Sequence, residues 1–152
     1  MKIAIIEDQP EKLQEILYFL EEFYEVKPCI KICESLKSGL ILIKNDQDFD
    51  LILLDMSMPV LDAKHDSHGL KPENFAGREL MKQMKIRGIS VPVVVVTQYA
   101  VFEKDNITLA ELNEEFEKSY QDFYKGCVYF QSSSDDWMQE LAEVLRGCNE
   151  QL

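Results

Sequence analysis

The sequence predicts an α/β protein with a doubly wound, five-stranded parallel sheet, and two observations support this fold class. Three short runs, at 3–6, 51–54 and 93–96, contain only apolar residues, as expected of strands buried on both faces of a parallel sheet. Segments with apolar residues at helical spacing separate the strand-like runs, so that strand and helix alternate five times. This order predicts right-handed crossovers and helices on both faces of the sheet.

The first helix follows strand 3–6 and begins near Pro10, because proline is well tolerated in a first helical turn. Its predicted apolar face consists of Leu13, Ile16, Leu17, Leu20 and Phe23. Its predicted charged face consists of Glu11, Lys12, Glu15, Glu21 and Glu22. A weaker strand at 26–33 is expected at a sheet edge, because Pro28 cannot donate a backbone hydrogen bond. A second helix at 36–43 then leads into strand 51–54.

The second half continues the alternation. Its predicted elements are a helix at 77–87, a strand at 91–97, a loop at 98–107, a helix at 108–124, a strand at 127–130 and a last helix that ends near Gly147. Gly88 suits the position just after a helix. Thr108 and Glu111 have capping-box spacing, which predicts a helix start. The serines at 132–134 can cap the last helix.

Composition narrows the class of protein. A chain of 152 residues fits one domain with a single core. With 16 basic and 28 acidic residues the formal charge is −12, which disfavours binding to nucleic acid or anionic membranes. No run reaches membrane-spanning length, and the apolar N-terminus is too short for a signal peptide. We therefore expect a soluble, cytoplasmic, single-domain protein without an effector domain.

The cysteines predict a reducing compartment. Cys29, Cys33, Cys127 and Cys148 lack CxxC spacing and lie mostly among apolar residues. We expect them to be small buried hydrophobic residues and not a disulfide framework.

Three predicted strands end in residues that can carry chemistry. Glu7 and Asp8 follow the first strand, Asp55 follows the third, and Thr97 ends the fourth. The carboxyl ends of parallel strands share one edge of the sheet, where ligands bind in open α/β folds. Crowded carboxylates there would repel one another unless a cation such as Mg²⁺ neutralised them. A carboxylate beside Mg²⁺ can accept a phosphoryl group, although an aspartate also ends strands simply because it favours turns.

Four motifs in order, IAIIEDQP, LILLDMSMP, VVVVTQY and GCVYF, resemble the receiver domain of two-component response regulators. The resemblance covers nearly the whole chain and implies the flavodoxin-like (βα)5 fold. It implies that Glu7, Asp8, Asp55 and the backbone carbonyl of Ser57 hold Mg²⁺. Asp55 would be the phosphoacceptor, and the hydroxyl of Thr97 would contact the phosphoryl group.

The resemblance also implies partners and a route for the signal. A histidine kinase or a phosphotransfer protein would supply the phosphoryl group, and Tyr129 would be the aromatic switch that reports it. Output would pass to a downstream protein by contact, with no nucleic acid or membrane involved. Any homodimer would use the face between the fourth and fifth helices.

The chain departs from the family at the end of the fifth strand. Receiver domains carry a lysine there, but this position falls on Gln131 or Ser132, depending on the alignment. Lys125 lies at the wrong end of the strand to replace it. Losing the cation removes a charge-assisted contact to the phosphoryl group. After Thr97, Gln98 is bulkier than usual, and Tyr99 could shield the site from water.

Two insertions form a second departure. An extra loop at 63–76 splits a turn that is short in the family, and the segment at 98–125 is longer than usual connections. Such loops are either lids or partner surfaces, or tolerated surface additions. Four residues, Asp62, His65, Asp66 and His68, can also be interpreted as metal ligands, but they lack the spacing of a structural zinc site.

Two other functions remain open from the sequence. A pseudo-receiver would keep the fold and act through protein contacts without phosphorylation; the missing lysine and the insertions favour it. A phosphatase of the haloacid-dehalogenase type also uses an aspartate at a strand end. That chemistry needs a second aspartate two residues later, where this chain has Ser57.

Overall fold

The computed structural model describes residues 1–62, 76–98, 101–102 and 107–150. Five parallel strands form one sheet in the order β2-β1-β3-β4-β7. The strands are β1 (Lys2–Ile6), β2 (Cys29–Cys33), β3 (Leu51–Leu54), β4 (Val93–Thr97) and β7 (Tyr124–Tyr129). The predicted doubly wound α/β fold is therefore confirmed.

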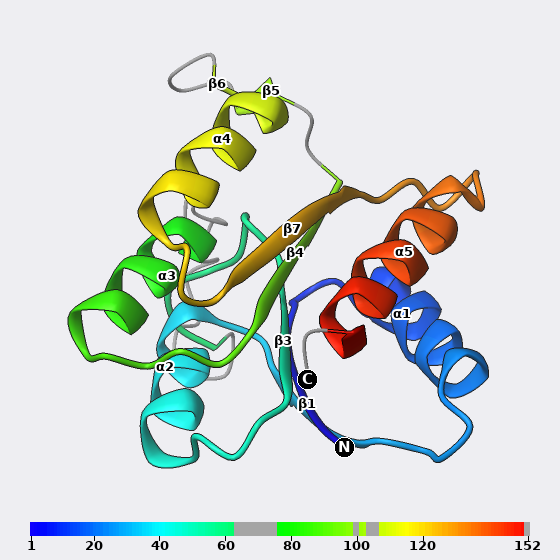
Figure 1. Cartoon of the computed structure of the whole chain (residues 1–152), viewed down its shortest axis with the longest axis horizontal. Coiled ribbons are helices and arrows are strands. Elements are labelled where there is room, and N and C mark those ends of the chain that lie inside the picture. The colour runs from blue at the N-terminus through cyan, green and yellow to red at the C-terminus, as the bar shows by residue number, and fades with distance from the viewer. Residues whose placement is uncertain (63–75, 99–100, 103–106, 151–152) are drawn as a thin grey trace.

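Helices cover both faces of this sheet (Figure 1). They are α1 (Pro10–Phe23), α2 (Leu36–Asn45), α3 (Ala76–Ile86), α4 (Leu109–Ser119) and α5 (Asp136–Glu150). One hydrophobic cluster joins the sheet to α1 and α5, and a second joins it to α2, α3 and α4. The unbroken apolar runs of β1, β3 and β4 lie between these clusters, which explains why the middle strands carry no alternating polar positions.

The edge strands of the sheet are more exposed than its central strands. β2 lies at one edge, as Pro28 predicted, and its residues are exposed or half-buried. Cys29 is exposed on this strand, and the other three cysteines are only partly buried, so the prediction of four buried cysteines is wrong.

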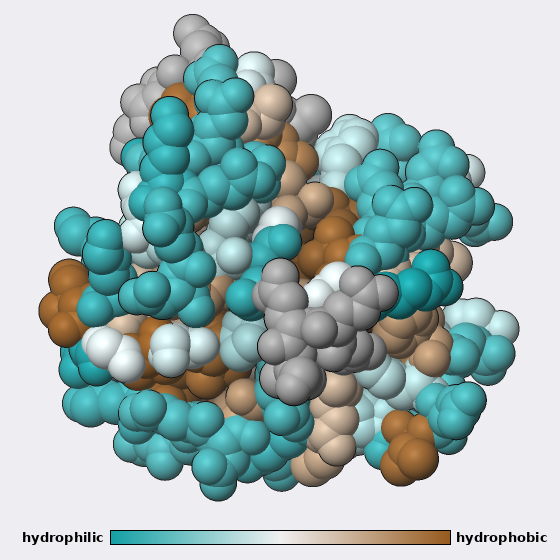
Figure 2. Space-filling view, viewed as in Figure 1, coloured by the Kyte–Doolittle hydropathy of each residue, from teal (hydrophilic) through white to brown (hydrophobic). Residues whose placement is uncertain are grey.

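Hydrophilic residues cover most of the face shown in Figure 2. No helix among the described residues is long and apolar enough to cross a membrane.

The segment between β4 and β7 differs from the sequence prediction. The helix ends at Ser119 and not at Tyr124, and β7 begins at Tyr124, before Gly126. Tyr124 is buried, packs edge-on against Phe116 and donates a hydrogen bond to Asn113 Oδ1. Burial of these aromatic rings in the core therefore ends the helix and starts the strand earlier than local propensity indicates. Gly126 has a φ of 147°, at a register shift between β4 and β7.

Other boundaries also differ. A short antiparallel pair, β5 (Val101–Phe102) and β6 (Ile107–Thr108), lies where a loop was expected. The helix α5 continues through Gly147 to Glu150, because a single glycine weakens a helix without ending it. The loop at 63–75, with His65, Asp66 and His68, lies outside the described residues, as does Tyr99.

Candidate functional site

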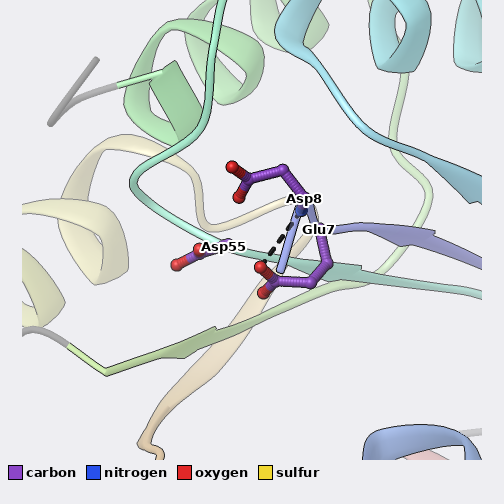
Figure 3. A group of neighbouring side chains, drawn as sticks. All are labelled: Glu7, Asp8 and Asp55. Carbon is purple, nitrogen blue, oxygen red and sulfur yellow. Dashed lines mark hydrogen bonds between the residues drawn. The ribbon is translucent and has the colours of Figure 1, made fainter. Parts of the chain in front are cut away.

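Strand register brings three carboxylates together at the carboxyl end of the sheet. Ile6 is paired with Leu54, and the backbone N–H of Asp55 donates to the Ile6 carbonyl at 3.1 Å. Asp55 therefore lies beside Glu7 and Asp8, which follow β1 directly. One carboxylate oxygen from each of these acids lies within 4.8 Å of the others. Figure 3 shows the three side chains.

The Glu7 carboxylate is held in place by backbone N–H groups and by a lysine ammonium group. Its Oε1 accepts the backbone N–H groups of Asp8 at 3.1 Å (Figure 3, dashed line) and Gln9 at 3.0 Å. Its Oε2 lies 2.5 Å from Lys12 Nζ. Burial, with a smaller contribution from the charge of Asp55, raises the pKa of Glu7 to about 7, because desolvation outweighs the opposing effect of the Lys12 ammonium.

Asp55 is less well satisfied. Its side chain is buried, and its Oδ1 accepts no hydrogen bond within the part of the chain that the structure describes. Asp8 is half-exposed, and burial followed by repulsion from Asp55 raises its pKa. An unsatisfied buried carboxylate oxygen beside two further acids is costly for the protein alone. Oxygen donors in this arrangement fit a hard divalent cation.

Lys12 is the largest departure from the sequence prediction at this site. The prediction placed it on the charged outer face of α1, but the residue is only 2% exposed. Its Nζ donates to the Val96 carbonyl at 2.6 Å and lies 3.4 Å from Asp55 Oδ1. A pattern in the sequence could have found it, because Lys12 is in phase with the residues that α1 buries: Ile16, Phe19 and Leu20.

Thr97 and Tyr129 are neighbours across the sheet. They are paired in the register of β4 and β7, and the Phe130 N–H donates to the Thr97 carbonyl at 2.7 Å. Thr97 is fully buried, whereas Tyr129 is 36% exposed. This arrangement pairs a buried residue at the end of β4 with a partly exposed residue of the neighbouring strand. The phosphoryl-contacting and switch roles of these two residues remain predictions.

The end of β7 has no lysine at the position expected in the family. Gln131 and Ser132 are both exposed, and the Gln131 amide lies 3.5 Å from the Tyr129 hydroxyl. Gln98 donates from its amide to Gln9 Oε1 at 2.8 Å, which links the loops after β1 and β4 at the edge of the site. Neither of the two alternative residues, Gln131 or Ser132, carries the positive charge that the family has at this position.

Ser57 and Asp62, two further candidate ligands, lie in different surroundings. Ser57 is buried just after Asp55, and metal binding by its backbone carbonyl remains a prediction. Asp62 instead lines a separate pocket with Ser35 and Leu61. Within the described ranges, the acidic cluster that could hold a metal consists of Glu7, Asp8 and Asp55.

A related sequence identifies the family of this chain, and solved structures share its fold. No protein-family model matches the chain. The chain is 31% identical over 151 residues to the Detocs response regulatory protein DtcB of Enterobacter cloacae (strain JD6301), a match that covers 95% of this chain and 98% of the relative.

Solved structures give the same fold. The receiver domain of the Francisella response regulator 1452 has a TM-score of 0.59 and 20% identity, covering 99% of this chain and 98% of that one. The Mn²⁺-bound form of response regulator Rcp1 has a TM-score of 0.63 and 18% identity, covering 94% and 90%. Together with the identity to the curated relative along almost its full length, this likeness shows that the chain belongs to the response regulators of two-component signalling and has their receiver-domain fold.

Proposed function

We propose that this receiver domain accepts a phosphoryl group on Asp55, with Mg²⁺ bound beside it. The observation that carries the proposal is the buried Asp55 Oδ1, which accepts no hydrogen bond among the described residues and lies in a cluster with Glu7 and Asp8. Asp8, Asp55 and the Ser57 carbonyl would hold the ion, and Glu7 would complete the acidic set. Mg²⁺, when bound, would neutralise charge on the carboxylates and on the incoming phosphoryl oxygens.

The residues of the chain would then act in the following way. An Asp55 oxygen forms a bond to phosphorus while the bond from phosphorus to the donor's leaving atom breaks, and the electron pair departs with the donor. Thr97, buried at the end of the neighbouring strand, has a hydroxyl that can donate to the phosphoryl group. Tyr129 would transmit the change to the outer surface, because it is paired with Thr97 and partly exposed.

The proposed partners follow from the family. A histidine kinase or a phosphotransfer protein would be the donor, and a downstream protein would receive the signal by contact, with the whole chain acting as a single receiver domain. The relative from Enterobacter cloacae is named a Detocs response regulatory protein, and we extend a regulatory role of that kind to this chain. The face formed by α4 and α5 remains the proposed surface for a homodimer.

Phosphorylation can be tested directly with acetyl phosphate and Mg²⁺. Intact-mass measurement should show one added phosphoryl group on the wild type and none on Asp55→Asn. Beryllium fluoride, a phosphoryl mimic, should change the fluorescence of Trp137. This residue is a suitable reporter because its ring lies 4.9 Å from that of Phe130, which follows β7 at the site. A wild-type protein that gains no phosphoryl mass and binds no beryllium fluoride would contradict the proposal.

A pseudo-receiver that acts without phosphorylation is the second candidate. The observation that favours it is the end of β7, where Gln131 and Ser132 bring no charge. This function predicts that Asp55→Asn retains full binding to the downstream partner and full output. Steady release of inorganic phosphate by the wild type would instead indicate a phosphatase, for which Ser57 stands in place of the second aspartate.

A further inference from the structure

We infer that Lys12, from the first turn of α1, supplies the positive charge at the phosphoryl group of Asp55 that no residue at the end of β7 provides. The inference rests on the phosphorylation of Asp55 proposed above. Lys12 Nζ lies 3.4 Å from Asp55 Oδ1, and the side chain is buried. Within the described part of the chain, it is the cation that forms an ion pair with Asp55.

The contacts of Lys12 leave it able to bind a new anion. An ammonium group has three N–H donors. One is directed to the Val96 carbonyl at 2.6 Å, and a second faces Glu7 Oε2 at 2.5 Å. The approach to Asp55 Oδ1 at 3.4 Å is an ion pair without a hydrogen bond. The ammonium therefore has one N–H left over from these two contacts, and its Nζ lies 3.4 Å from an oxygen of the carboxylate that would carry the phosphoryl group.

Glu7 has a different role in this arrangement from the one that the sequence predicted. Its Oε2 pairs with Lys12, and its Oε1 already accepts two backbone N–H groups. Glu7 therefore acts as a positioning residue that holds the ammonium toward Asp55. The Phe130 ring lies 5.8 Å from Lys12 Nζ on another side and helps to exclude water. A fixed charge in a buried site stabilises developing negative charge more strongly than a mobile one in water.

The position of Lys12 also explains how a receiver can lose the strand-end lysine. Transfer of the phosphoryl group adds negative charge to a site that already contains Glu7, Asp8 and Asp55. The bond from phosphorus to acetate breaks as the bond to Asp55 forms, and charge accumulates on the phosphoryl oxygens and on the departing acetate. An ammonium that reaches these atoms from α1 serves the same electrostatic purpose as one that reaches them from β7.

The test compares Lys12→Met with wild type and with Lys27→Met as the matched control. Lys27 is exposed and pairs with Glu21 at the surface, so its substitution should change nothing. Lys12→Met should accept phosphate from acetyl phosphate about 10²-fold more slowly, the usual effect of removing one preorganised electrostatic donor. Its affinity for beryllium fluoride should fall, whereas its affinity for Mg²⁺ alone should be unchanged or higher, because three acids then lack their cation.

The results separate the inference from the proposed function. If the wild type is not phosphorylated, the proposed function fails and the inference fails with it. If Lys12→Met is phosphorylated at the wild-type rate, only the inference fails. Affinities for Mg²⁺ and beryllium fluoride that fall together by the same factor would show a merely structural role and would also overturn it.

A measurement on the wild type covers the case in which Lys12→Met does not fold. Lys12 is the lysine that is buried among the described residues, so its ¹⁵N-labelled ammonium should be protected from exchange and visible by NMR. Addition of beryllium fluoride in the presence of Mg²⁺ should shift this signal well beyond the change that Mg²⁺ causes alone. A signal that beryllium fluoride leaves in place would overturn the inference.

Discussion

At Glu7, burial and charge act in opposite directions. Desolvation, helped by the charge of Asp55, raises the pKa of this carboxyl from 4.5 to about 7 despite the opposing effect of the Lys12 ammonium. Between these two values the folded protein holds a proton that the unfolded chain releases. The folded state therefore binds more protons in this window, and raising the pH through it favours unfolding.

We expect the free energy of unfolding to contain a Glu7 contribution that falls as pH rises from about 4.5 to about 7. The loss should reach about 3 kcal/mol at most. Urea unfolding in buffers with EDTA, at half-unit steps of pH, measures it against Glu7→Gln. The difference between the two proteins isolates Glu7, because the other carboxyls titrate in both. Parallel pH profiles would contradict this assignment.

Among the elements, α3 is placed unusually close to the end of β3. The Gly77 N–H donates to the Met56 carbonyl at 3.1 Å. A Cβ added at Gly77 would lie 2.5 Å from the Asp55 carbonyl oxygen and 3.0 Å from Met56 Cα. Both are backbone atoms, so no rotation of a side chain can relieve the clash. Glycine at this position therefore allows the helix to pack against the strand end that carries Asp55.

Gly77→Ala should destabilise the protein by about 1–3 kcal/mol, the usual cost of overpacking, and should slow phosphorylation of Asp55 by displacing its backbone. Gly147→Ala is the matched control. Apart from its chain neighbours and the backbone of its own helix, no atom of the described residues lies within 4 Å of a Cβ at Gly147, inside α5, so alanine there should stabilise by up to about 1 kcal/mol. Thermal or urea unfolding measures both changes. Equal effects of the two substitutions would show that contact with the strand end is unimportant.

At the scale of the whole molecule, the acidic site affects the stability of the fold. Two hydrophobic clusters, one on each face, hold the sheet rigid, so the acids are kept close even though they repel. The raised pKa of Asp8, caused first by burial and then by Asp55, records this repulsion. An ion that binds only the folded arrangement must stabilise the fold by mass action.

Mg²⁺ should therefore raise the free energy of unfolding, by about 2.7 kcal/mol at a hundred times its dissociation constant. EDTA should reverse the effect. In the Asp8→Asn/Asp55→Asn double variant the metal-free protein should be more stable than the metal-free wild type, because the repulsion is gone, and Mg²⁺ should add nothing. Thermal unfolding with and without Mg²⁺ measures this. If Mg²⁺ stabilised the double variant as much as the wild type, the ion would have to bind at another site.

Much of the fold could be predicted from local patterns. The unbroken apolar runs of β1, β3 and β4, the helical spacing between them and Pro28 at the edge strand each reflect whether a segment is buried on two faces, one face or neither. The errors arose where contacts between distant segments decide. Burial of Tyr124 against Phe116 ends α4 early, and the pairing of Val101–Phe102 with Ile107–Thr108 forms a strand pair in a predicted loop.

By itself, the sequence determined that this is a receiver-type α/β domain and that Glu7, Asp8, Asp55 and Thr97 follow or end its central strands. All strands of a parallel sheet run in the same direction, so the residues at their carboxyl ends lie at one edge of the sheet. The helical phase of Lys12 permits its burial, but only the tertiary structure decided where its ammonium lies. Its four-carbon side chain can reach water or the core from the same helix. The choice depends on the acids and the carbonyl of Val96, which come from β1, β3 and β4 and meet only when the sheet is complete.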